Sequence, residues 1–456
     1  MLEMIIRKTK PKILIPLSFA VLIVIGTLLL MLPMATQSGE GASIANALFT
    51  STTSVCVTGT VVVDTFSYWS LFGKIVILLL IQVGGLGIMS VIVLLFYNAR
   101  GNLSLHGVVL LKDIYNVDNL SGVGRLLRKV FRLTFAIEFL GMLAYLPSFV
   151  PRFGAIRGAW ISLFTSVSAF CNAGIDIIGP DSLMSYSGDY YIMTVTMLLI
   201  ILGGIGYIVL LNIEMKIDLM NRIRHVHSKF VRMREHTKLA ITVTLVLIIV
   251  GALLILVLEW DNPETIGYMS LPDKLMNSLF QSVTLRTAGF ATIPQECLRD
   301  SSALVCIILM FIGGSPMGTA GGIKTVTFYL LFANINSFIL GKDETVVFGR
   351  RVTGESIKKA TSIAVVHLSI MLIITVWLLA LTNAPVTDVM YEVASATSTV
   401  GVSRGFVLTL PDIRQLILII AMYLGRIGPI SMLFLFNSDT DNGAGVRTAE
   451  GHFIIG

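Results

Sequence analysis

The sequence predicts an all-α integral membrane protein in which one helix–loop–helix unit is repeated four times. Three observations support this fold class: an apolar composition, short polar segments that each end at a glycine, and a regular spacing of those glycines. Of the 456 residues, 55% are hydrophobic and only 13% are charged, whereas a soluble protein has about 25% charged residues. The chain therefore has too few charged residues for an ordinary water-facing surface.

Long apolar stretches supply the expected spanning helices. Residues 13–34 and 239–260 are two examples, and each reaches the roughly 20 residues that a helix needs to cross a bilayer. The four cysteines are too few and too scattered for a disulfide framework. The composition therefore indicates a protein that is embedded in a membrane, not one that is held together by disulfide bonds or that binds a nucleic acid.

Between the long stretches, four short segments share one pattern. Each begins with about ten to fifteen helix-like residues, too few to cross a membrane, and ends in a polar run with a glycine. They occupy residues 45–60, 161–175, 275–290 and 389–402, with Gly59, Gly174, Gly289 and Gly401 as the glycines. The glycines are 115, 115 and 112 residues apart. Such regularity indicates one ancestral unit repeated four times.

A second landmark follows in each copy, because the next apolar stretch contains a cluster of glycines. The clusters lie at residues 84–87, 203–206, 313–322 and 425–428. Each unit therefore reads as a helix, a half-helix with its loop, and a second helix. The sequence predicts eight transmembrane helices and four re-entrant pore helices.

These repeats divide the chain into five regions. Residues 1–100 form the first repeat, and residues 101–215 form a cytoplasmic connection followed by the second repeat. Residues 216–341 form a cytoplasmic connection followed by the third repeat, and residues 342–436 form a cytoplasmic connection followed by the fourth. Residues 437–456 form a C-terminal tail. Of the 33 basic residues, 23 lie at the termini and in alternate connections, against 6 in the other connections. Basic loops stay in the cytoplasm. Both termini are therefore predicted to be cytoplasmic.

Four re-entrant loops require a shared environment. Irregular backbone at membrane depth is tolerated only inside protein or along a watery path. Gathering the four loops around one pseudo-fourfold axis satisfies this condition, with their carbonyl oxygens facing a common path. The alternative, ordinary helix packing through small residues, explains one such segment but not four in register.

The glycine segments are predicted to form a selectivity filter for a cation, and the residues themselves leave K+ and Na+ open as the ion. Stacked main-chain carbonyl oxygens can replace the water around a cation, and glycine permits the backbone angles that turn them inward. We expect Ser51, Thr52 and Thr53 to tie the first half-helix to its neighbours. The predicted filter residues are Val57, Thr58, Gly59, Asn172, Ala173, Gly174, Thr287, Ala288, Gly289, Thr399, Val400 and Gly401.

The motifs "RTAGF" (286–290), "GGSPMGTAGGIKT" (313–325) and "LGRIGP" (424–429), with one filter glycine per copy, resemble the Trk/Ktr/HKT superfamily of K+ uptake proteins. The resemblance covers nearly the whole chain and is greatest to the KtrB-like branch, the membrane subunit of the bacterial Ktr system, which has eight spans. It implies K+ uptake across the bacterial plasma membrane by a homodimer with one pore per protomer. It also implies a cytosolic partner, an octameric ring of KtrA-type subunits that binds ATP or ADP, and no covalent cofactor on this chain.

The third copy carries Arg286 three residues before its glycine, where the other copies have cysteine or serine. A guanidinium facing the ion would repel it, so Arg286 is expected to lie behind the filter and brace it. Its partner would be backbone, or an acid such as Glu392.

Five glycines and a proline within residues 313–325 should prevent a helix there, leaving a flexible loop below the filter. We interpret this loop as a gate, and the alternative is a simple kink. The resemblance places Arg426 in the pore beneath the filter, where it adds to an electrostatic barrier, and Lys324 is expected nearer the cytoplasm. The predicted gate residues are Gly313, Gly314, Ser315, Pro316, Gly318, Thr319, Gly321, Gly322, Lys324 and Arg426.

Two further observations bear on mechanism. Glu138 lies within an apolar stretch. Its two expected roles are a structural salt-bridge partner or a site that binds a proton. The chain has no His-Glu-x-x-His motif, and Ser315 has no base matched to it, so an enzyme is not indicated. A Na+- or H+-coupled alternating-access symporter is the rival to a channel, but it would favour paired intramembrane acids and inverted repeats.

Overall fold

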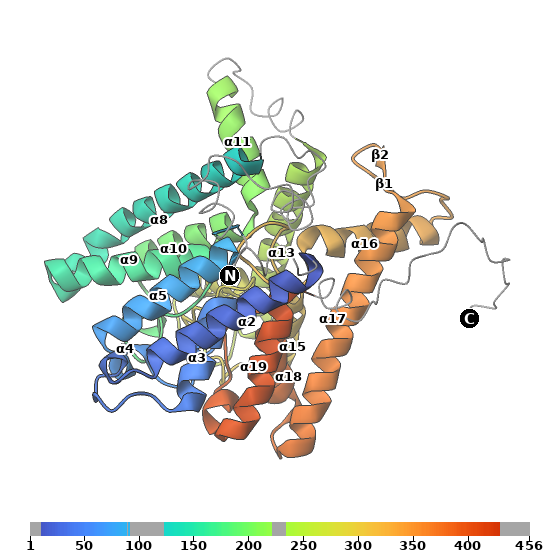
Figure 1. Ribbon diagram of the computed structural model, residues 1–456. Coiled ribbons are helices and arrows are strands. Elements are labelled where there is room, and N and C mark those ends of the chain that lie inside the picture. The colour runs from blue at the N-terminus through green and yellow to red at the C-terminus, as the bar shows by residue number, and fades with distance from the viewer. Residues whose placement is uncertain (1–10, 89, 92–122, 221–233, 429–456) are drawn as a thin grey trace.

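The computed structural model describes residues 11–88, 90–91, 123–220 and 234–428. Its regular elements are helices, joined by loops, and one short hairpin of β1 and β2 (Figure 1). Twelve of the described helices form four consecutive groups of three. The first group is α2 (Pro11–Leu30), α3 (Ile44–Cys56) and α5 (Leu71–Leu86); the second is α8 (Val123–Phe153), α9 (Ala155–Cys171) and α10 (Tyr190–Gly204). The third is α13 (Glu235–Leu258), α14 (Leu271–Thr284) and α15 (Asp300–Phe311); the fourth is α17 (Gly354–Leu381), α18 (Val386–Thr397) and α19 (Asp412–Ile427).

The remaining elements are short or extend a group. They are η1 (Pro33–Ala35), α4 (Thr65–Tyr68), η2 (Met184–Tyr186), α11 (Tyr207–Met220), α16 (Thr325–Ile339), β1 (Val346–Val347), β2 (Arg350–Arg351) and η3 (Phe406–Thr409). The predicted tail, residues 437–456, lies outside the described residues, as does most of the connections at 101–122 and 216–233.

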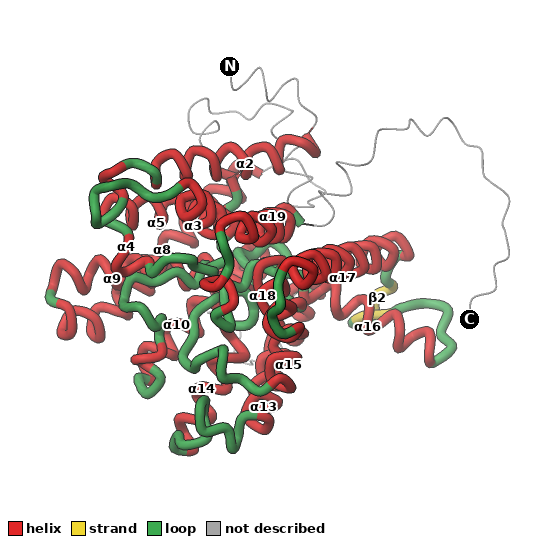
Figure 2. The backbone as a smooth tube through the Cα atoms, turned by 90° about the horizontal axis from the view of Figure 1, so that it is seen from below, coloured by secondary structure: helices red, strands yellow, loops and turns green. Residues whose placement is uncertain are grey.

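The four groups contact one another in a closed cycle. Each middle helix packs against the first helix of its own group, and the third helix of each group packs against the middle helix of the next. The contacts between groups are α5 with α9, α10 with α14, α15 with α18, and α19 with α3. The last pair joins the fourth group to the first, so the ends of the middle helices lie toward a common centre (Figure 2).

A serine hydroxyl fastens the middle helix to the first helix in three groups. Ser51 donates to the carbonyl oxygen of Ile23 at 2.7 Å, and a Cβ atom on Gly26 would overlap this hydroxyl. In the second and third groups, Ser166 donates to the Glu138 carbonyl at 2.6 Å and Ser282 to that of Ile248 at 2.8 Å, beside Gly141 and Gly251. The hydroxyl of Ser51 therefore ties α3 to a neighbour as predicted.

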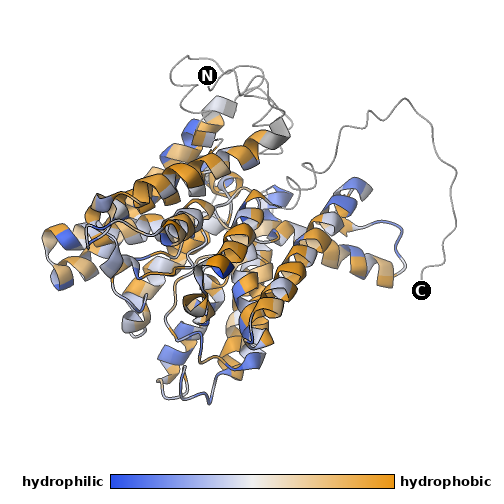
Figure 3. Ribbon diagram, turned by 60° about the horizontal axis from the view of Figure 1, so that its bottom comes forward, coloured by the Kyte–Doolittle hydropathy of each residue, from blue (hydrophilic) through white to orange (hydrophobic). Residues whose placement is uncertain are grey.

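The ribbon of the outer helices has mostly the colour of hydrophobic residues (Figure 3), and many of their large apolar side chains are exposed. Three described helical segments are long and apolar enough to cross a membrane, namely Leu126–Phe153, Glu235–Leu258 and Gly354–Leu381. A fourth counts if α10 and α11, bent by 100°, form one broken span. The other apolar helices are shorter, so the number of eight spans stays a prediction.

Candidate ion site and gate

The chain takes the same unusual backbone path at the end of each middle helix. Two residues with positive φ stand two positions apart, and the second is always the predicted filter glycine. The φ angles are 55° and 98° at Val57 and Gly59, 58° and 63° at Asn172 and Gly174, 70° and 86° at Thr287 and Gly289, and 52° and 101° at Thr399 and Gly401. Side chains rarely adopt these angles, whereas glycine does so without steric cost. The four segments therefore turn their carbonyl groups in the same way.

These segments meet one another as a ring. A Cβ atom on any of the four glycines would overlap, or press within 2.7 Å of, a carbonyl oxygen of the next segment. The carbonyl neighbours are Ala173 for Gly59, Ala288 for Gly174, Val400 for Gly289 and Thr58 for Gly401. The structure thus brings the twelve predicted filter residues together, although they come from four parts of the chain more than 100 residues apart.

Backbone hydrogen bonds hold each segment to its helix. The N–H of the residue before each glycine donates at 2.8 Å to a helix carbonyl, and the donors are Thr58, Ala173, Ala288 and Val400. In two segments the glycine N–H also donates to a helix hydroxyl at 3.0 Å, Gly59 to Thr53 and Gly401 to Ser395. Thr53 therefore fixes its own filter segment. The expectation for Thr52 was wrong, because its hydroxyl donates to Leu48 within the same helix.

The chemistry of this ring is that of uncharged oxygen. Within the described part of the chain, no group of three His, Cys, Asp or Glu side chains could hold a metal ion. The hydroxyl oxygens of Thr58, Thr60 and Thr399 are buried and have no hydrogen-bond partner among the described residues. Carbonyl oxygens from four segments that meet suit a dehydrated alkali cation, which here would be cargo rather than a resident cofactor.

The second glycine landmark packs directly behind the ring. A Cβ atom on Gly84, Gly203 or Gly425 would overlap a helix carbonyl oxygen, that of Val55, Phe170 or Thr397 respectively. Each of these carbonyls belongs to the residue four positions before a filter glycine. The sequence revealed these clusters, but not that they let the third helix of a group touch the end of its middle helix.

We expect Gly203→Ala to lower the midpoint of thermal unfolding by several degrees, because its methyl group would overlap the Phe170 carbonyl and force the backbone to shift. Overpacking of this kind costs about 1–3 kcal/mol. The neighbouring Gly204→Ala is the matched control, since its Cβ would come no closer than 3.2 Å, to the Asn172 amide. Unfolding of the purified protein in detergent measures both, and equal midpoints would contradict the packing role.

Arg286 lies behind the third filter segment and bonds to main chain. Its side chain is 6% exposed and donates to the carbonyl oxygens of Thr244 at 3.3 Å and Gly313 at 3.0 Å. Of the two expected kinds of partner, backbone is therefore the one that the structure shows, and Glu392 is not a partner of Arg286. The Glu392 carboxylate accepts instead from the N–H of Arg404 at 3.1 Å and from the Ser403 hydroxyl. Arg286 therefore joins the filter segment to α13 and to the glycine-rich loop.

Replacing Arg286 by glutamine is expected to weaken both the filter and the loop, because the carbonyl groups of Thr244 and Gly313 lose a charged donor. Losing a hydrogen bond to a charged group costs about 1.5–3 kcal/mol. We expect lower thermal stability and weaker cation uptake by liposomes containing the purified variant. Arg286→Lys is the control for charge alone. Lysine keeps the positive charge, but its single ammonium group does not reproduce the two guanidinium donors that bond to Thr244 and Gly313. Wild-type uptake and stability in Arg286→Gln would count against a bracing role.

The glycine-rich segment is not helical, as predicted. Helix α15 ends at Phe311 and α16 begins at Thr325, and a β-bridge between Ile312 and Ile323 closes the base of the intervening loop. The loop docks on the break between α10 and α11 through three backbone hydrogen bonds. The N–H groups of Ser315 and Thr319 donate to the carbonyl oxygens of Gly204 (2.8 Å) and Gly203 (3.1 Å). In the other direction, the Tyr207 N–H donates to the Met317 carbonyl oxygen (2.9 Å). Gly321 N–H also reaches the hydroxyl of Thr287 in the third filter segment at 3.2 Å.

Two basic side chains hold this loop from the other side. Arg426 donates to the carbonyl oxygens of Thr319 and Gly84, each at 2.6 Å. Lys324 donates to the Ala320 carbonyl at 2.6 Å, so its ammonium group folds back on the loop. Its expected position nearer the cytoplasm stays a prediction. The predicted gate residues thus form one docked unit beside the ring, with Arg426 linking it to α5 of the first group.

Buried polar side chains also support the filter from behind. Glu138 accepts from Gln82 at 2.9 Å and from the thiol of Cys171 at 3.7 Å, so the partners seen in the described residues are neutral. His367 contacts the hydroxyl of Ser398 at 3.3 Å. Cys171, Arg286 and Ser398 share the position three before a filter glycine, and each reaches the first helix of its own group. Aligning the four segments could have revealed this shared position. Nothing in the sequence indicated that Gln82 donates to Glu138.

The chain is similar to known cation uptake proteins over most of its length. The chain is 36% identical over 451 residues to the Ktr system potassium uptake protein B of Bacillus subtilis, covering 99% of this chain and 98% of the relative. It is 34% identical to the potassium/sodium uptake protein NtpJ of Enterococcus hirae, covering 94% and 93% of the two chains. It is 33% identical to the Ktr system potassium uptake protein B of Vibrio alginolyticus, covering 93% and 91%.

A solved structure shares the fold. The potassium transporter TrkH of Vibrio parahaemolyticus matches with a TM-score of 0.74 at 18% sequence identity, covering 94% of this chain and 86% of that one. Residues 6–444 also match the family model described as "TrkH: Cation transport protein". The chain therefore belongs to the TrkH family of cation transport proteins.

Proposed function

We propose that this protein takes up K+ across the bacterial plasma membrane through a gated single-file pore. The observation that carries the proposal is the ring of four glycine segments, each pressed against a carbonyl oxygen of the next. Such a ring can exchange main-chain oxygens for the hydration shell of a cation. Uptake would be driven by the membrane potential, which supplies about 2.3 kcal/mol per charge for each 100 mV.

In this proposal the four groups of helices are repeats around a pseudo-fourfold axis. The middle helices α3, α9, α14 and α18 are re-entrant pore helices, and the flanking helices give eight spans with both termini in the cytoplasm. The cyclic contacts between groups support this reading, because the same pair of elements meets at each of the four junctions. The ends of the middle helices then direct their partial negative charge toward the ion.

The glycine-rich loop is the gate of the proposed pore. Its hydrogen bonds reach the filter at Thr287, the α10–α11 break and, through Arg426, helix α5. A closed state held by many weak contacts can open when a partner moves one of these elements. The names of the relatives refer to a Ktr system, and we propose a homodimer regulated by a cytosolic ring of KtrA-type subunits that binds ATP or ADP.

The second candidate is a Na+- or H+-coupled symporter. One relative is named a potassium/sodium uptake protein, and Glu138 is a buried acid close to the second filter segment. The two candidates differ in whether a second ion must move with K+.

Flux into liposomes at a clamped voltage tests the proposal. The purified protein is reconstituted without its partner and then with it, and uptake of radioactive Rb+ is measured with equal Na+ concentration and pH on both sides. The pore predicts uptake that follows the voltage alone. Uptake that appears only with a Na+ or proton gradient would defeat the channel and support the symporter.

A further inference from the structure

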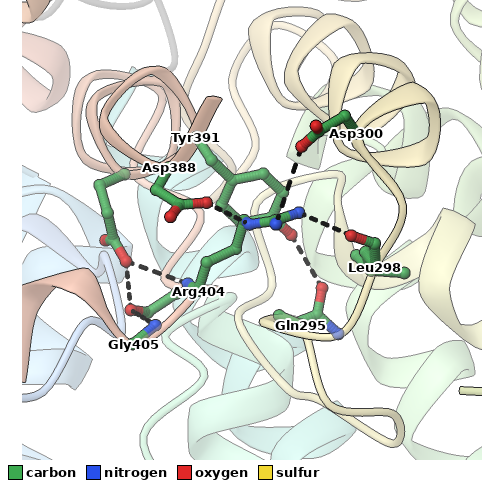
Figure 4. Close-up of polar contacts among 9 residues, drawn as sticks. Gln295, Leu298, Asp300, Asp388, Tyr391, Arg404 and Gly405 are labelled. Carbon is green, nitrogen blue, oxygen red and sulfur yellow. Dashed lines mark hydrogen bonds and ion pairs between the residues drawn. The ribbon is translucent and has the colours of Figure 1, made fainter. Parts of the chain in front are cut away.

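The chain that leaves the fourth filter segment carries a buried arginine. Arg404 follows Gly401 by three residues, and its side chain is only 10% exposed. Its Nε lies 2.7 Å from Oδ1 of Asp388, and one terminal nitrogen donates to the Leu298 carbonyl at 3.0 Å (Figure 4). The other terminal nitrogen lies 4.0 Å from Oδ1 of Asp300. Every nitrogen of this guanidinium therefore faces an oxygen atom.

The main chain beside Arg404 is held just as firmly. Glu392 on the pore helix α18 accepts from the N–H of Arg404 at 3.1 Å and from the hydroxyl of Ser403. The Gly405 N–H donates to the same hydroxyl at 3.0 Å. Since Asp388 also lies on α18, one helix fixes both the backbone and the side chain of this segment.

The arginine also crosses from the fourth group to the third. Leu298 and Asp300 lie at the start of α15, whereas Asp388 and Arg404 belong to the fourth group. A second bond crosses nearby, from the hydroxyl of Tyr391 to Oε1 of Gln295 at 2.8 Å (Figure 4). Arg404 thus ties the fourth filter segment to the third group at the junction where Val400 meets Gly289.

We infer that Arg404 is a positioning residue that sets the separation of the third and fourth filter segments, and with it the preference for K+ over Na+. The inference rests on the proposed function. Na+ is the smaller ion, and in this inference the ring disfavours it because the oxygens are kept from closing around it, one of the two accounts given for K+ selectivity in such filters. A guanidinium with a planar fork of donors can hold two chain segments at a fixed distance, which a lysine cannot do.

Competition between ions in liposomes tests this inference. Radioactive Rb+ uptake by the full-length protein is measured against rising Na+. For Arg404→Gln we expect about a tenfold fall in the Na+ concentration that halves uptake, the change that ~1.4 kcal/mol of differential binding produces. Arg404→Lys should recover little of the loss, because it restores the charge but not the fork.

The double variant Arg404→Gln with Asp388→Asn separates position from charge. It removes one positive and one negative charge, so a purely electrostatic role predicts wild-type competition, whereas positioning predicts that the loss remains. Restored selectivity in the double variant, or wild-type selectivity in Arg404→Gln, would overturn the inference. If Arg404→Gln fails to fold, Asp388→Ala gives the same reading, since it removes the acceptor of the arginine Nε at a side chain that is 26% exposed.

Arg152→Gln is the matched control. Arg152 forms an ion pair with Asp189 at 2.6 Å within the second group and contacts no filter segment in the described structure. Its loss should leave ion competition unchanged. Wild-type protein that carries no Rb+ would defeat the proposed function itself, whereas normal transport with unaltered selectivity in the Arg404 variants defeats only this inference.

Discussion

The variant Gly401→Ala is expected to abolish K+ uptake. A methyl group at this position would overlap the carbonyl oxygen of Thr58 and lie 2.8 Å from the Cα atom of Gly59 in the facing segment. Gly401 also has φ of 101°, where a side chain costs about 1–3 kcal/mol in strain. Strain and overlap act on the same few atoms, so relaxation must move carbonyl oxygens of the ring. Growth of a bacterium that lacks K+ uptake, supplied with the variant, measures the effect at low external K+.

Gly179→Ala is the control for this variant. Gly179 lies five residues beyond the filter glycine of the second segment, and a Cβ atom there would have nothing within 4 Å. It should therefore rescue growth as well as the wild type does. The same substitution at Gly59, Gly174 or Gly289 is expected to behave like that at Gly401, because each faces a carbonyl oxygen of the next segment. Full rescue by all four variants at normal membrane abundance would show that these glycines do not line the ion path.

The sequence was sufficient to locate the four glycine segments that meet in the ring, for a physical reason. The last residue of each segment has a positive φ angle, which favours glycine, so four copies of one structure leave four glycines at regular spacing. The break in the third group was predictable in the same way, because glycine and proline act on the local backbone. Local rules of this kind do not depend on the rest of the chain.

Contacts between distant segments were not predictable from those rules. Arg286 was expected to bond to backbone or to an acid such as Glu392, and the local rules did not decide between the two. In the structure two carbonyl groups satisfy Arg286, and Glu392 serves the segment around Arg404. Lys324 likewise turns to a carbonyl of its own loop. Main-chain oxygens are abundant wherever helices are broken, and the sequence does not record which of them lies within reach.

The docked loop explains why a broken helix is stable beside the ring. Its backbone N–H groups, which a helix would have used internally, donate to Gly203, Gly204 and Ile323. Unpaired buried N–H groups cost free energy comparable to a lost hydrogen bond, so the loop keeps this conformation only while α10 and α11 remain bent. A movement of α11 would therefore be felt at the loop through Tyr207, whose N–H holds the Met317 carbonyl.

Arg426 is the side chain whose removal should open the pore most. Its two bonds, to Thr319 in the loop and Gly84 in α5, tie the gate across the path from the fourth group to the first. The guanidinium also opposes an entering cation, since two unit charges repel by about 4 kcal/mol at ~4 Å and an effective dielectric constant of ~20. Arg426→Gln removes the charge and leaves one amide to replace two charged donors. We therefore expect basal Rb+ flux into liposomes without the partner to rise at least about tenfold, the effect of ~1.4 kcal/mol.

Two further variants divide this effect between charge and tether. Arg426→Lys keeps the positive charge but cannot bond to Thr319 and Gly84 at once, so its flux should fall between those of the wild type and Arg426→Gln. Arg414→Gln removes an arginine from the other end of the same helix and should leave basal flux unchanged. Flux at or below the wild-type level in Arg426→Gln, in protein of normal thermal stability, would mean that the loop stays closed without this residue. In that case the hydrogen bonds of the loop to the α10–α11 break would be sufficient to keep the loop closed.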